Sequence, residues 1–88
     1  MSVILGVVRD PIGNPVPQAR VAFAVGPVPL PDIAALTDAN GAFTLSAPAP
    51  GEYVLQVFSE EFVTKKVKIA IVSKQEKYIE IYLSRSNG

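Results

Sequence analysis

The sequence contains no cysteine and no histidine, and these two absences exclude several kinds of chemical site. Without cysteine there is no disulfide framework, no thiolate metal site and no thiol nucleophile. Without histidine the chain lacks the side chain that most often serves as a general base and as a metal ligand. A catalytic site therefore has few residue types to draw on, and we expect neither a cofactor nor a metal.

The sequence also lacks an excess of charge of either sign. Eight basic and eight acidic residues cancel, so the formal net charge is zero. Binding to nucleic acid or to an anionic membrane surface is favoured by an excess of positive charge, and we expect neither partner. A net charge near zero leaves little electrostatic repulsion between copies of the chain, which favours self-association.

A long apolar run is missing as well. The run Val3–Val8 is six residues long, whereas a membrane helix needs about 20 apolar residues. A signal peptide requires a basic start and a small-residue cleavage site, which we do not find. We therefore expect no membrane insertion and no signal peptide in the chain as given. A length of 88 residues with 49% hydrophobic residues predicts one domain, residues 1–88, around one core.

Eight prolines and six glycines divide the chain into short segments. The breaks DPIGNP, GPVPLPD, DANG and APAPGE are rich in residues that favour turns. Between the breaks, apolar side chains recur at every second position, which predicts β-strands with one buried face. The side chains expected to point inward are Val21, Phe23, Val25, Phe43, Leu45, Tyr53, Leu55, Val57, Val67, Ile69, Ile71, Ile79, Ile81 and Leu83.

A first strand at Val3–Arg9 and a short strand at Ile33–Thr37 bring the total to about seven, with little or no helix. Short strands at this spacing predict an all-β sandwich, in which the apolar faces of two sheets cover each other.

The turns and strands together resemble the carboxypeptidase regulatory-like domain. The segments that carry the resemblance are GVVRDPIGNPVPQARVAF, TDANGAFTL, PAPGEYVLQV and FVTKKVKIAI, in this order from Ile4 to Ile71. The resemblance implies a seven-stranded antiparallel Greek-key β-sandwich of the transthyretin (prealbumin) type. It also implies a non-catalytic domain in an extracytoplasmic setting, although the compartment stays open. Glu61 stands where the family often has glycine, so we expect backbone strain there if its φ is positive.

The segment Thr37–Leu55 contains Asp38, Asn40 and Gly41, which also occur at this spacing in a calcium-binding EF-hand loop. In that register the first and the twelfth ligand positions fall on Leu36 and Ala47, whose side chains offer no ligand oxygen. We therefore interpret the segment as a turn, in which the carboxylate and amide bond to nearby backbone groups and Gly41 supplies a positive φ.

Other polar clusters also have a structural interpretation that is simpler than a chemical one. Glu60 and Glu61 are adjacent acids, and at a strand junction they are typical of a solvated edge rather than of an acid–base pair. The late lysines are interleaved with glutamates, which favours a solvent face with ion pairs over a nucleic-acid site. We expect no enzyme activity.

Charged residues are sparse in the first part of the chain, where only Arg9, Asp10, Arg20, Asp32 and Asp38 lie in residues 1–51. The loop Gly26–Leu36 in this part is stiffened by proline and carries four large apolar residues: Val28, Leu30, Ile33 and Leu36. Exposed, they would form a protein-binding surface. Alternatively, the loop folds back and covers one end of the sandwich.

These observations lead to two hypotheses. The first is a non-catalytic interaction module that contacts a protein partner or a second copy of itself, through an edge strand or the Gly26–Leu36 loop. The second is a carbohydrate-binding accessory domain that uses Tyr78 and Tyr82, which lie on the outward face of the last strand because their spacing is even.

Overall fold

The computed structural model describes residues 2–30 and 34–86, and every regular element in this part of the chain is a β-strand. The strands are β1 (Ser2–Arg9), β2 (Arg20–Val25), β3 (Ala34–Leu36), β4 (Ala42–Ala47), β5 (Gly51–Phe58), β6 (Lys65–Ile71) and β7 (Glu76–Tyr82). The described residues include no helix that could cross a membrane. The predicted all-β class with seven strands is confirmed. The predicted strand at Ile33–Thr37 is shorter, and Ile33 lies outside the described residues.

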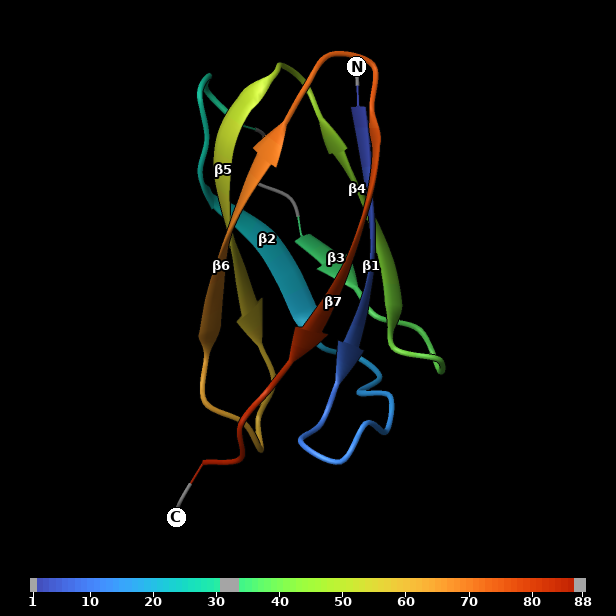
Figure 1. Ribbon diagram of the computed structural model, residues 1–88. Helices are drawn as coiled ribbons and strands as arrows, with labels where there is room; N and C mark the ends of the chain where they lie inside the picture. The colour runs from blue at the N-terminus through green and yellow to red at the C-terminus, as the bar shows by residue number, and fades with distance from the viewer. Residues whose placement is uncertain (1, 31–33, 87–88) are drawn as a thin grey trace.

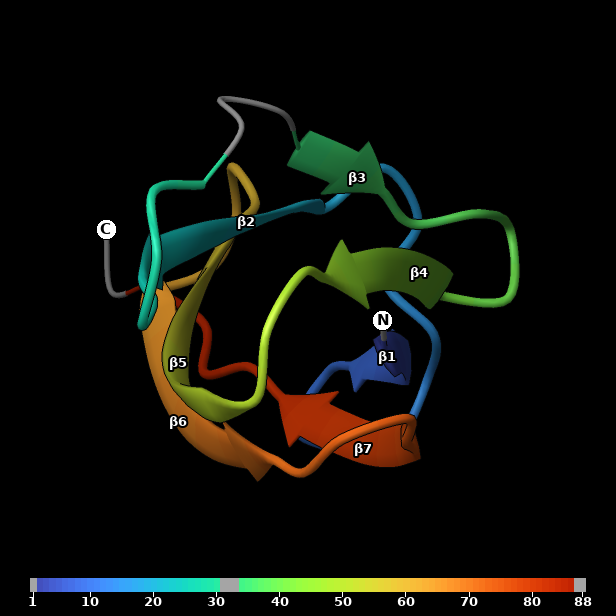
Figure 2. The ribbon, with the colours of Figure 1, turned by 90° about the horizontal axis from the view of Figure 1, so that it is seen from above.

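The strands form two sheets that face each other (Figure 1). One sheet has the order β4-β1-β7, and the other has the order β3-β2-β5-β6. Seen from above, β6 and β7 lie beside each other on one side of the sandwich, while β3 and β4 lie together on the other side (Figure 2). On the side where β6 and β7 meet, Lys65 Nζ donates a hydrogen bond to the Tyr82 carbonyl oxygen at 3.1 Å, and this bond joins the two sheets.

The core consists of the apolar side chains that alternate along the strands. Tyr53, Leu55 and Val57 of β5 are completely buried, as are Ile4 and Val8 of β1. Each buried side chain of this size contributes roughly 1.5–3 kcal/mol through its removal from water. Because successive side chains of a strand point to opposite faces, the sequence pattern is sufficient to identify most of this core.

Val25 is an exception, since the prediction that it points inward is wrong. Its side chain is 59% exposed. The reason is a β-bulge: Phe23 pairs with Leu55, whereas Val25 pairs with Val54, the next residue of β5. The extra residue in β2 reverses the direction of the side chains that follow it. Val25 therefore lies on the outer surface.

One strand pair departs from the antiparallel arrangement that we expected. β1 pairs with β7 in parallel, from Val3 opposite Glu76 to Arg9 opposite Tyr82. A parallel pair requires a crossover connection between its two strands, and here the chain passes through β4 and the four-stranded sheet between β1 and β7. β1 is thus the central strand of the three-stranded sheet, with β4 on its other side.

Two turns at the lower end of Figure 1 have the same internal bonding. Asp38 Oδ1 accepts hydrogen bonds from the Asn40 and Ala42 N–H groups at 2.8 and 2.9 Å, and Gly41 has a φ of 75°. This confirms the interpretation of the segment as a turn. Asp10 Oδ1 accepts from the backbone two and four residues later in the same way, at 3.0 and 2.9 Å.

Candidate functional site

The three described apolar residues of the predicted protein-binding surface, Val28, Leu30 and Leu36, do not lie in one environment. Leu30 is half-buried, packs against the core and lies next to Gly26. This position is the one expected if the loop folds back over one end of the sandwich. Val28 and Leu36 are exposed. Val28 lies three residues after the end of β2, whereas Leu36 pairs with the first residue of β2, so they lie near opposite ends of that strand. Ile33 lies outside the described residues.

Tyr78 and Tyr82 are 59% and 46% exposed on the outer side of β7. Glu80 lies between them on the same side of the strand. Tyr78 is opposite Leu5, and Tyr82 is opposite Arg9, in the neighbouring strand β1. The expectation that both rings face outward is correct.

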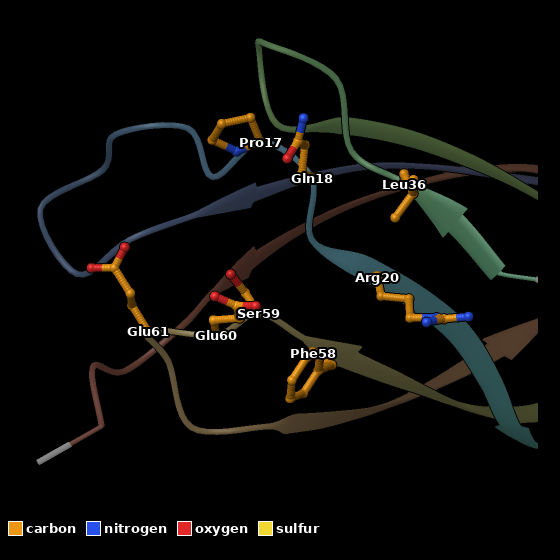
Figure 3. Close-up of a pocket in the computed structure, with 8 residues that line it drawn as sticks. All are labelled: Pro17, Gln18, Arg20, Leu36, Phe58, Ser59, Glu60 and Glu61. Carbon is orange, nitrogen blue, oxygen red and sulfur yellow. The ribbon is translucent and has the colours of Figure 1, made fainter. Parts of the chain in front are cut away.

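An open groove of about 360 Å³ lies at the lower end of the four-stranded sheet (Figure 3). Its walls come from the start of β2, the end of β3 and the end of β5. The residues that line it are Pro17, Gln18, Arg20, Leu36, Phe58, Ser59, Glu60 and Glu61.

Three of these residues form a row across neighbouring strands. Arg20 of β2 pairs with Leu36 on one side and with Phe58 on the other. Leu36 is 65% exposed and Phe58 is 49% exposed. Two large apolar side chains are therefore exposed to solvent, and the guanidinium group of Arg20 lies on the strand between them (Figure 3). Exposed aromatic and arginine side chains are typical of residues that dominate protein interfaces.

The wall beside this row is held by a buried threonine. Thr37 Oγ1 donates a hydrogen bond to the Val16 carbonyl oxygen at 2.6 Å and accepts one from the Ala19 N–H at 2.8 Å. The Gln18 N–H in turn donates to the Thr37 carbonyl oxygen at 2.9 Å. Gln18 has a φ of 58°, which is uncommon for a residue other than glycine and carries backbone strain. These bonds fix the position of Gln18 at the rim of the groove.

The acidic end of the groove is linked to the last described segment of the chain. Arg85 Nη1 lies 3.8 Å from Glu61 Oε1, and Arg85 Nη2 lies 3.5 Å from Asp10 Oδ2. The guanidinium also lies over the Phe62 ring, 4.8 Å from its centroid. Glu61 does not have a positive φ, so the strain expected there is absent; the described residues other than glycine with a positive φ are Gln18 and Lys74.

The groove combines exposed apolar side chains with one arginine and two carboxylates. Among residues 2–30 and 34–86, no three His, Cys, Asp or Glu side chains lie together as a metal site requires. Sequence reasoning identified Leu36 and the acids but missed Gln18, Arg20 and Phe58. Phe58 had a usable signal, because it is a large aromatic residue in the outward phase of its strand. Gln18 had none, since glutamine is not a residue that favours a positive φ.

The model of the carboxypeptidase regulatory-like domain matches residues 3–84. No curated protein matches the chain. Several solved structures share the fold at low sequence identity. The major pilin subunit of Bacillus cereus aligns with a TM-score of 0.75 at 14% identity, over 93% of this chain and 28% of the pilin.

A type II cohesin–X-dockerin complex from Acetivibrio cellulolyticus contains a chain that aligns with a TM-score of 0.71 at 15% identity, over 94% of this chain and 57% of that chain. The 3-chlorocatechol 1,2-dioxygenase of Rhodococcus opacus aligns with the same TM-score and identity, over 97% of this chain and 60% of the enzyme. This chain therefore spans at most 60% of these three proteins, and the similarity establishes a common fold.

Proposed function

The chain belongs to the carboxypeptidase regulatory-like domain family, and we propose that it is a non-catalytic module that makes protein contacts through its four-stranded sheet. The contact surface is the outer side of β3-β2-β5-β6, together with β3, which is an edge strand of this sheet. The observation that carries the proposal is the row Leu36–Arg20–Phe58 over the groove. It retains Leu36 from the Gly26–Leu36 loop as a contact residue.

Two further features support this proposal. The charged side chains that line the groove, Arg20, Glu60 and Glu61, are exposed to solvent, and Glu61 forms an ion pair with Arg85. They do not form a buried cluster. In addition, two of the solved structures with this fold are named as parts of assemblies, one as a pilin subunit and one as a cohesin–dockerin complex. A contact surface with exposed apolar side chains fits a role in assembly better than one in catalysis.

Site-specific photo-cross-linking tests the proposal. A photoreactive residue replaces Leu36 in one variant and Ile12 in a control, because Ile12 is also an exposed apolar residue but lies in the first turn, away from the groove. In an extract of the source cells, we expect a defined protein adduct from position 36 that is lost on adding Arg20→Glu. Equal adducts at both positions, or none at position 36, would contradict the proposal.

A carbohydrate contact at Tyr78 and Tyr82 is a second candidate, and its support is the exposure of both rings on one side of β7. Sugar rings stack on flat aromatic faces, and such a contact would shift the ring signals of both tyrosines. A titration with soluble cello-, xylo- and chito-oligosaccharides, followed by NMR, tests this candidate. Ring signals that stay unchanged throughout the panel would eliminate it.

A further inference from the structure

The outer side of β1 is apolar although no strand of the described chain lies over it. Val3, Leu5 and Val7 point outward and are half-buried, while Ile4 and Val8 point into the core. Strands with one solvated face alternate apolar and polar residues, whereas strands covered on both faces are apolar throughout. β1 has the second pattern, so its outer side has the composition of a covered surface.

The outward side chains of β4, β1 and β7 form what we call the three-stranded face. Along β7 this face bears Glu76 opposite Val3, Tyr78 opposite Leu5 and Glu80 opposite Val7. Both glutamates and Tyr78 are exposed. Arg9 lies on the same face, with its Nη2 atom 3.8 Å from Glu80 Oε2. The three-stranded face is thus an apolar ridge with an acidic border on the β7 side.

The outward side chains of β3, β2, β5 and β6 form the four-stranded face, whose character is the opposite. Its exposed cations are Arg20 of β2 and Lys66 and Lys68 of β6. Ala22 and Ala24 line a hollow of about 200 Å³ next to Arg20 and Phe58. Glu52 lies at the far end, opposite Ala70. The four-stranded face therefore has a hollow beside its two alanines, exposed apolar side chains at Leu36, Phe58 and Val25, and a basic border on the β6 side.

The two borders are on the same side of the molecule, because β6 and β7 lie beside each other (Figure 2). A second copy that is displaced perpendicular to the sheets, without rotation, places its β7 over β6 of the first copy. Its β1 then lies over the central strands of the four-stranded face. The acidic border of the second copy then meets the basic border of the first copy. The apolar ridge of the second copy faces the hollow beside Ala22 and Ala24 of the first copy.

We infer that copies of this chain stack, with the three-stranded face of one copy on the four-stranded face of the next. This inference rests on the proposed function, since it uses the proposed contact surface as one half of the interface and names a second copy as the partner. Because the two halves are different surfaces, the contact does not close on itself, and the stack grows with concentration. Complementary charge borders make it sensitive to salt, and zero net charge leaves no overall repulsion against it.

Light scattering coupled to size-exclusion chromatography, at two concentrations about tenfold apart, measures this association. We expect the average mass of the wild-type chain to rise with concentration and to fall when salt is added. The basic border is reversed in Lys66→Glu/Lys68→Glu, and the acidic border in Glu76→Lys/Glu80→Lys. Each double variant alone should associate roughly tenfold more weakly, because contacts between opposite charges become contacts between like charges.

Mixing the two double variants is the decisive step, since each presents the border that the other needs. We expect the mixture to regain association, with the two variants in equal amounts in the larger species. The matched control is Lys74→Glu, which changes the net charge as Lys68→Glu does but lies in the turn before β7. We expect Lys74→Glu to associate as the wild type does and Lys68→Glu to associate more weakly.

A wild-type chain that stays monomeric at both concentrations in low salt would overturn the stack, as would a mixture that does not regain association. The cross-linking experiment distinguishes this failure from failure of the proposed function. If position 36 still gives a specific adduct with another protein, the four-stranded face is a contact surface and only the identity of the partner is wrong. If both experiments fail, the proposed function fails too.

Discussion

Replacing Thr37 with valine removes one buried hydroxyl that joins the segment after β3 to the segment before β2. The hydroxyl donates to the Val16 carbonyl oxygen at 2.6 Å and accepts from the Ala19 N–H at 2.8 Å, and the residue is 3% exposed. Valine has nearly the same shape, so the substitution leaves no cavity. The backbone donor of Ala19 and the backbone acceptor of Val16 both lose their partner in a place that water does not reach easily.

The expected loss follows from these two orphaned groups. A buried polar group without a partner costs about 1–3 kcal/mol, and the extra methyl group of valine returns part of this. We therefore expect Thr37→Val to lower the free energy of unfolding by roughly 2–4 kcal/mol. A domain of this size has a total stability of roughly 4–13 kcal/mol. The substitution thus removes a large share of it and lowers Tm by roughly 10–20 °C.

Urea denaturation and a thermal scan measure this loss, with two control variants. Thr37→Ser keeps the hydroxyl and loses only a methyl group, so it should cost about 1 kcal/mol. Thr44→Val changes an exposed threonine of β4 and should stay within about 0.5 kcal/mol of the wild type. If Thr37→Val is as stable as Thr44→Val, the hydroxyl does not hold the wall of the groove, and the reasoning is refuted.

Two further substitutions test the packing of the core and one of its turns. Gly6→Ala places a methyl carbon 2.3 Å from two carbons of the Phe43 ring, and urea denaturation should show a loss of roughly 2–3 kcal/mol. The double variant Gly6→Ala/Phe43→Leu should lose less than the two single variants together, because the smaller side chain relieves the overlap; strictly additive losses would argue against that overlap. Tyr53→Phe removes a hydroxyl that accepts from the Ala49 N–H at 3.1 Å and donates to the Ala49 carbonyl oxygen. It should lower the free energy of unfolding by about 1–2 kcal/mol, and an unchanged urea midpoint would mean that the turn is held by its prolines alone.

Most of the core was predictable because it depends on a local rule. Ile79, Ile81 and Leu83 alternate with polar or aromatic residues, and they lie half-buried or buried as the alternation predicts. Val25 follows the same rule in sequence but not in space. The bulge after Phe23 is set by how β2 pairs with β5, a strand far along the chain, so no local pattern reveals it.

The candidate site was predictable only in part, for a related reason. Leu36 was identified because it is a large apolar residue in a segment with few charges. Arg20 and Phe58 join it only through the registers of two strand pairs, which the sequence does not specify. The parallel pairing of β1 with β7 is likewise a choice between partners that are distant in sequence. Periodicity indicates which side of a strand is buried, but not which strand lies beside it.

The pairing of β1 with β7 also determines when this domain can fold during its synthesis. Ser2 Oγ donates to the Val72 carbonyl oxygen, and these partners are 70 positions apart. At a synthesis rate of 5–20 residues per second, β1 waits roughly 4–14 s for this end of the chain. Every strand of the four-stranded sheet is made within that interval, whereas β1 keeps an open edge and two apolar sides until β7 emerges. The nascent chain is therefore most exposed to aggregation during the seconds before β7 leaves the ribosome.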